Sequence, residues 1–214
     1  MPTGWPQRLM ARTLLGVALG LPAAGALVVA GPTTKAGASV SIPVPFDDLV
    51  RRSVAAVVVT PLSERFDWIE GRIVTFTELR VDLLLAGDVG VTDEPIWVET
   101  LGGVVEHVGQ SVEGEASFRL GRPSLLFLRP PPDPLRGAQE RAFVVTARAQ
   151  GQFAVVRDAQ HDARLRRSGG VGGMLAPAGA HVSGAPLASD VLHGVKLTDA
   201  TATIRGAWGR LHAP

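Results

Sequence analysis

The side chains with the clearest chemical potential lie in a glycine-rich connection, residues 102–115. It carries Glu106, His107, Gln110, Glu113 and Glu115. An imidazole beside carboxylates can bind a cation or act as a base, but zinc usually takes three or four ligands and no second histidine is near. Unstructured loops longer than about 12–15 residues are usually functional or disordered. We expect a structural or solvated loop, with partner contact, metal binding or catalysis as the functional alternatives.

Trp68 extends this candidate surface with an aromatic side chain. It lies in a polar segment, residues 64–71, whose composition and final glycine are typical of a hairpin turn. An indole there can stack on a sugar or a peptide. The partner surface predicted from the sequence therefore consists of Trp68, Glu106, His107, Gln110 and Glu113.

Familiar catalytic and cofactor patterns are absent from the sequence. Ser124 follows Gly-Arg-Pro and does not stand in a nucleophile elbow. The glycine run at residues 169–173 lacks the Lys-Ser/Thr of a phosphate-binding loop. The chain has no cysteine, which excludes thiolate nucleophiles, disulfides and cysteine-ligated zinc, and its five histidines are dispersed. We predict no catalytic residue, no cofactor and no metal, and a non-enzyme rather than an enzyme.

The elements that would position these residues are mostly strands. A helical turn is predicted over residues 46–52 and a valine-rich strand over residues 53–62. Residues 72–86 alternate strongly, with a change of phase at residues 77–78 that predicts a β-bulge. Further strands are predicted over residues 95–101 and 123–129, and residues 142–149 and 152–157 read as a final hairpin. The predicted core consists of Val57, Val59, Val81, Leu83, Val98, Leu126 and Leu128.

Five or six short strands with frequent turns predict a mainly β domain, a small barrel or sandwich, over residues 39–158. Residues 159–196 are rich in glycine, alanine and proline and read as a flexible, poorly ordered extension. In residues 197–214 one helical face collects Leu197, Ala200, Ile204, Trp208 and Leu211. This periodicity predicts a short docking helix.

Residues 1–38 have the three parts of a signal peptide. Arg8 and Arg12 precede an apolar stretch over residues 14–30, and Ala36-Gly37-Ala38 offers a cleavage site. We expect cleavage after Ala38 and a secreted or periplasmic protein, with a retained N-terminal membrane anchor as the alternative. No later stretch is long and apolar enough to span a bilayer.

The charge of the mature chain argues against nucleic acid as a partner. Removing Arg8, Arg12 and Lys35 from 21 basic residues leaves 18, against 20 acidic ones, a net charge of −2. Nucleic-acid binding draws its affinity from lysine and arginine on phosphates. We expect a monomer whose partner is an extracytoplasmic protein or glycan.

Residues 54–128 resemble the netrin-like barrel, the fold of the inhibitory domain of the tissue inhibitors of metalloproteinases. The matching segments are residues 55–59, 72–81, 84–87, 96–100, 120–121 and 125–128. The chain also resembles a group of secreted bacterial proteins of no established function, through residues 101–103, 109–110 and 149–151. The resemblance implies an oligonucleotide/oligosaccharide-binding (OB) type of barrel. The animal inhibitors bind the zinc of their target through a terminal cysteine, which this chain lacks.

Three functions follow as hypotheses. The first is an exported, non-enzymatic binding or interaction module of unknown ligand. The second, implied by the resemblance alone, is a protease inhibitor or protease-associated domain. The third is a hydrolase with an unrecognised site that uses Glu106 or His107.

Overall fold

The computed structural model describes residues 41–90, 93–132, 142–171 and 184–213. All of them lie in the second of the two units into which the chain divides, residues 37–214. The predicted signal peptide and residues 172–183 of the predicted flexible extension lie outside the described residues. Within those ranges no helix is long and apolar enough to cross a membrane.

The protein is mainly β, as the sequence predicts, and two long strands dominate it. β1 (Ala55–Ile69) and β2 (Arg72–Gly87) form a hairpin. Its two turn residues, Glu70 and Gly71, both have positive φ, which matches the twist of a two-residue hairpin turn. The prediction of a polar turn over residues 64–71 is therefore wrong for residues 64–69, which continue β1. Their polarity reflects exposure, because polar side chains are tolerated in a strand that has one face open to solvent.

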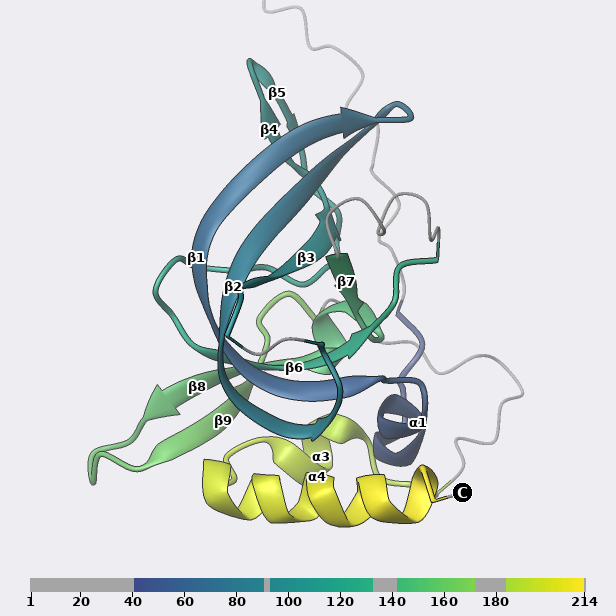
Figure 1. Cartoon of the computed structure of the whole chain (residues 1–214), viewed down its shortest axis with the longest axis vertical. Coiled ribbons are helices and arrows are strands. Elements are labelled where there is room, and N and C mark those ends of the chain that lie inside the picture. Colours follow the sequence, from purple (N-terminus) through teal and green to yellow (C-terminus); the bar gives the residue numbers. More distant parts are fainter. Residues whose placement is uncertain (1–40, 91–92, 133–141, 172–183, 214) are drawn as a thin grey trace, which may run out of the picture. The chain divides into compact units, whose positions relative to one another are not determined.

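Five strands close into a ring-like sheet (Figure 1). Its order is β1-β2-β3-β7-β6, and pairing between β6 and β1 closes the ring. The shorter members are β3 (Ile96–Leu101), β6 (Ser124–Arg129) and β7 (Ala142–Val145). Among the described strands, β3 and β7 pair in parallel and the other pairs are antiparallel. β8 (Gln152–Arg157) and β9 (Ala163–Arg167) extend the sheet beyond β6.

The predicted hairpin between residues 142–149 and 152–157 is wrong. β7 and β8 both pair with β6, at different points along it, and not with each other. Ala147 and Arg148 have left-handed φ values of 57° and 54°, and a 3-10 helix, η1 (Arg148–Gly151), follows. This irregular corner separates the two strands.

The β1–β2 ladder contains irregularities that rotate side chains between its faces. The register shifts where Val58 pairs with Leu83 and Val59 with Val81, so Asp82 is an extra residue in β2. A bulge moves the following side chains to the opposite face. Leu83 is 41% exposed, and its predicted place in the core is wrong. A bulge does occur opposite residues 77–78, where one was predicted, because Pro61 pairs with Leu79 and Ser63 with Glu78. Its extra residue, however, is Leu62 of β1 and not a residue of β2.

The two larger of three apolar clusters lie on the two sides of the ring wall. The inner core contains Val57, Val59, Val98, Leu126 and Leu128, all predicted from the sequence and all buried. The outer core contains the alternate residues of the same strands, packed against helices. Continuous apolar runs such as residues 55–59 and 125–128 are therefore buried on both faces.

Three helices cover the outer core (Figure 1). They are α1 (Phe46–Arg51), where the helical turn was predicted, α3 (Ala188–Leu192) and α4 (Leu197–Leu211). α4 buries Ala200 and Ile204 on the face that the sequence predicts. Gly87 allows the close approach of α4, because a Cβ there would lie 2.7 Å from Trp208 Cζ2 and 2.0 Å from Val54 O.

Two further segments are more ordered than the sequence suggests. Residues 159–196, expected to be flexible, contain β9 and α3, because β9 pairs along its whole length with β8. The connection at residues 102–115 is not an open loop either. It contains a hairpin of β4 (Gly103–Val105) and β5 (Val108–Gln110), which projects from the end of the ring opposite the helices (Figure 1).

Candidate functional site

A groove opens at the end of the ring where the β4–β5 hairpin projects. Its volume is about 480 Å³, within the range of ligand pockets. The groove is lined by the second half of β1, the first half of β2, the end of β3, the hairpin and residues 111–118. Another hollow, lined by Val44, Gln150 and Phe153 among others, measures about 20 Å³ and holds little more than one water molecule.

The floor of the groove is polar, unlike the rest of the ring interior. Thr75 and Thr77 of β2 and Thr100 of β3 continue the inward-facing rows that lower in the ring consist of Leu79 and Val98. The Thr75 hydroxyl donates to the carbonyl of Gly102 at 2.6 Å. Thr77 Oγ1 is buried without a hydrogen-bond partner among the described residues, which is uncommon for a buried hydroxyl. At this end of the ring, threonine side chains therefore take the positions that apolar side chains occupy lower down.

One wall is the β4–β5 hairpin, which is fastened at its base. The backbone N–H of Ile73 donates to Gln110 Oε1 at 2.7 Å, and the Ile73 carbonyl accepts from Gly102 N at 2.8 Å. Gly103 has φ of 129°, and a Cβ there would lie 2.6 Å from Phe66 Cδ1 and from Thr75 Oγ1. Glycine at this position lets the hairpin lie directly against β1 and β2.

The facing wall, residues 111–118, has no strand partner among the described residues, and the Gln152 side chain pairs with its backbone. Gln152 Oε1 accepts from Ser117 N at 3.1 Å, while its Nε2 donates to Ser117 O at 2.6 Å. The side-chain amide thus replaces the pair of hydrogen bonds that a neighbouring strand would supply. Phe118, on the same wall, is half-buried against the inner core.

Glu115 is the most perturbed acid in the groove. Burial raises its pKa, since desolvation disfavours the carboxylate. Hydrogen bonds from the backbone of Ala116 and Leu101 and the charge of Arg148 act against this shift. Arg148 Nε lies 3.6 Å from Glu115 Oε2. The groove therefore holds a largely buried acid with a cationic neighbour, Arg148.

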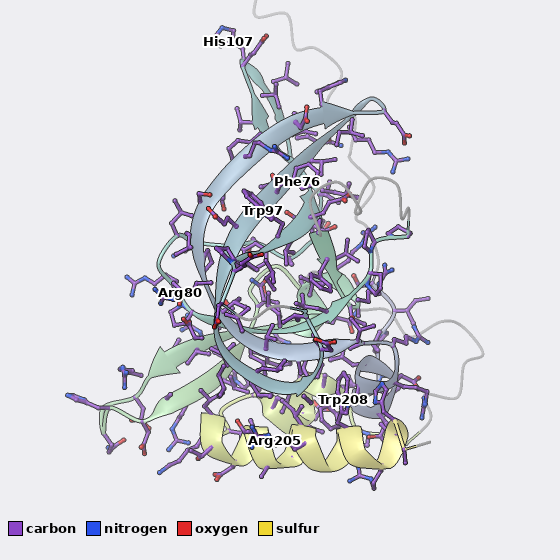
Figure 2. All side chains as sticks on the ribbon, viewed as in Figure 1. Phe76, Arg80, Trp97, His107, Arg205 and Trp208 are labelled. Carbon is purple, nitrogen blue, oxygen red and sulfur yellow. The ribbon has the colours of Figure 1, made fainter. Side chains whose placement is uncertain are left out.

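The residues that the sequence predicted as a partner surface do not form one site. Gln110 lies at the base of the hairpin, lines the groove and has a structural hydrogen bond. Glu106, with φ of 53°, and His107 form the turn at the hairpin tip, away from the groove; Figure 2 shows His107 there. Glu113 is exposed and does not line the groove. Trp68 is 52% exposed, but it stands in β1 and not in a loop.

The aromatic and hydroxyl residues of the groove, above all Phe66 and Thr77, are not among the candidates that the sequence predicts. The available signal was the alternation of residues 64, 66 and 68, which is that of a strand with one face directed into a site. Among the described residues no group of three or more His, Asp or Glu side chains is placed to hold a metal ion.

Comparisons with protein families, with curated proteins and with solved structures found no match to this chain. Its function therefore has to be inferred from its own residues.

Proposed function

We propose that this protein is an exported, non-enzymatic binding module that holds its ligand in the groove at the open end of the ring. The observation that carries the proposal is a groove of about 480 Å³ with a floor of threonines where the ring would otherwise be filled with apolar side chains. Pockets of this size with a few convergent polar groups are the usual form of a ligand site.

Export is supported by the N-terminal sequence. Arg8, Arg12, the apolar stretch and Ala36-Gly37-Ala38 are those of a cleaved secretory signal. Cleavage after Ala38 leaves every described element in the mature protein, because the first helix begins at Phe46. The ligand is then an extracytoplasmic molecule.

We also propose that the ring is an OB-type, netrin-like barrel. Support comes from its five strands, from the closure between β1 and β6 and from the helices on its outer side. OB-type barrels bind ligands through loops at the rim and through one face of the sheet. Inhibition of a metalloproteinase through a terminal cysteine is not part of the proposal, because the chain contains none.

The groove lining favours a neutral or cationic ligand. Its charged side chains are Glu64 and Glu115, and no lysine, arginine or histidine of the described chain lines it. Phe66, Phe118 and Val104 supply apolar area. A nucleic acid or another polyanion would meet only carboxylates here, without the cations that phosphate binding needs.

Two valines of the hairpin provide a matched test. Val104 lines the groove and Val108 does not, although both are exposed. Val108 pairs with Val105, so it lies on the opposite face of the hairpin from Val104. Val104→Trp should narrow the groove and Val108→Trp should leave it open, with the same added bulk.

The assay is capture of partners from the extracytoplasmic fraction by immobilised mature protein, with binding then quantified for the captured ligand. We expect Val104→Trp to weaken binding at least about tenfold, or about 1.4 kcal/mol, and Val108→Trp to leave it unchanged. Equal binding by both variants, with unaltered melting curves, would place the ligand outside the groove.

A further inference from the structure

The second half of β1, residues 60–69, has one edge without a strand partner among the described residues. β6 pairs only with residues 55–59 of β1, whereas β2 pairs with β1 as far as Ile69. From Thr60 onward, therefore, β1 has a strand partner on one side only among the described residues. One loop contact, from Gly121 N to Pro61 O at 2.9 Å, covers the start of this edge. Residues 64–68 beyond it are all exposed.

The pairing identifies which backbone groups face the open edge. Ile73 directs its N–H and C=O away from β1, to Gln110 and Gly102. Trp68 and Ile73 therefore form a pair without mutual hydrogen bonds, and such pairs alternate along an antiparallel ladder. The pairs Phe66–Thr75 and Glu64–Thr77 are of the same kind.

The N–H and C=O of Glu64, Phe66 and Trp68 consequently point away from β2. The Trp68 N–H is satisfied locally by Asp67 Oδ1 at 2.8 Å. The groups of Glu64 and Phe66 have no such partner among the described residues. They repeat every second residue, about 6.8 Å apart, which is the spacing of donors and acceptors along an extended peptide.

The side chains along this edge complete a peptide-binding arrangement. Glu64 and Phe66 line the groove, and Trp68 projects from the same face of β1 two residues further on. Phe66 and Trp68 are 42% and 52% exposed. The unpaired N–H and C=O groups of a strand edge are a template for pairing with another chain. Here the exposed carboxylate of Glu64, at the edge of the groove, favours a basic chain.

We propose that the ligand of this groove is an extended polypeptide segment with basic residues, which adds as a strand to the open edge of β1. The backbone of Glu64 and Phe66 supplies the main-chain hydrogen bonds. An apolar side chain of the peptide packs between Phe66 and Val104, and a basic one faces Glu64. Main-chain bonds provide the affinity and alternate pockets the selectivity, as in other cases of strand addition. The inference rests on the proposed binding function and names its ligand class.

The first test uses peptide probes on the mature protein. The reference probe is acetyl-Lys-Val-Lys-Val-Lys-Val-Lys-amide, followed by the backbone amide spectrum and by the fluorescence of the tryptophans. We expect shifts at the amides of Glu64 and Phe66. The same peptide with glutamate in place of lysine should bind at least about tenfold more weakly, because its carboxylates would face the carboxylate of Glu64.

Backbone methylation distinguishes strand addition from other contacts. An added strand uses the N–H groups of every second residue only. Methylating one alternate set of peptide nitrogens should therefore weaken binding at least about tenfold, and methylating the other set should change it much less. Equal effects of the two sets, or no binding of any peptide, would overturn the inference.

A matched pair of variants tests the protein side. Glu64→Pro removes an N–H that faces the open edge and leaves the ladder to β2 intact, which is the position where a strand tolerates proline. Glu64→Ala removes the same side chain and keeps the N–H. We expect Glu64→Pro to lose at least about tenfold more affinity than Glu64→Ala. If Glu64→Pro does not fold, the methylated peptides on the native protein decide the question.

Two other occupants are distinguishable outcomes. A neutral hexasaccharide that shifts Phe66 and Thr100 where the peptides do not would favour a glycan, and would overturn the inference while leaving the binding function in place. Dimerisation in sedimentation experiments that Glu64→Pro abolishes would assign the edge to a second copy. Loss of partner capture in Val104→Trp, with no peptide binding, would likewise retain the groove and reject strand addition.

Discussion

The variants Leu126→Ala and Leu83→Ala test where the structure and the sequence pattern disagree about the core. The pattern predicts both side chains in the core. In the structure Leu126 is fully buried, whereas Leu83 is 41% exposed. Leu126 pairs with Val57 on one side and with Gln152 on the other. Since strands on both sides hold the site open, a cavity left by Leu126→Ala cannot readily collapse.

The expected magnitudes follow from this difference. Buried leucine-to-alanine changes cost about 2–5 kcal/mol, and a site that cannot relax belongs in the upper part, about 3–5 kcal/mol. Leu83→Ala removes the same atoms from a partly solvated position without a closed cavity, for which we expect about 1 kcal/mol. For a chain of this size each kcal/mol lowers Tm by about 2–4 °C, so Leu126→Ala should lower it by about 6–20 °C and Leu83→Ala by about 2–4 °C.

The assay is urea and thermal unfolding of the mature protein, followed by circular dichroism. The urea m-value should stay the same in both variants, because a change in m would indicate an altered native or denatured state. Equal losses of stability in the two variants would refute the argument. It would mean that Leu83 faces the core and that β2 has no bulge at Asp82.

Four further predictions address the groove, the helix contact, the buried acid and processing. Gln110→Ala should cost about 1–3 kcal/mol, because it leaves the Ile73 N–H unsatisfied; faster hydrogen exchange in residues 103–110 would show that the hairpin detaches. Gly87→Ala should lower Tm clearly more than Gly71→Ala, since both glycines have positive φ but only Gly87 touches α4; similar losses would contradict the close contact with Trp208. Burial raises the pKa of Glu115, so the folded state retains a proton that the unfolded chain releases, and the contribution of this group to stability falls as pH rises above about 4.5. Glu115→Gln should therefore become more stable relative to the native protein between about pH 4 and pH 7 in urea titrations, and a constant difference would argue against the shift. N-terminal sequencing of the exported protein should begin at Ser39, and an intact Met1 on membrane-bound protein would favour a retained anchor.

Much of the scaffold was predictable because its signals are local. The valine-rich run at residues 55–59 and the apolar run at residues 125–128 gave buried strands, and their composition alone indicates burial on both faces. Phe46, Leu49 and Val50 gave α1 through their spacing, and the periodicity after Leu197 gave α4. Glycine at residues 71 and 87 marked the two ends of β2.

The candidate site was predictable only in part. The sequence singled out residues 102–115 as a candidate segment, and the structure brings Gln110 and Glu115 of that segment to the groove. Glu106, His107 and Glu113 attracted notice as titratable side chains, yet the hairpin carries the first two to its tip. Phe66 and Thr77 were missed because their role depends on facing a hairpin that lies more than 25 residues further along the chain.

The sequence by itself determined the mainly β character, the strands of the inner core, the first and last helices and the exclusion of cysteine chemistry, since each follows from residue type and short-range spacing. Only the tertiary structure decided which face of β2 carries Leu83, that β7 and β8 both pair with β6, and that β1 beyond Thr60 has β2 as its one strand partner among the described residues. These features depend on register between segments distant in the chain. A shift of one residue in register reverses every side chain of a strand while leaving its composition unchanged.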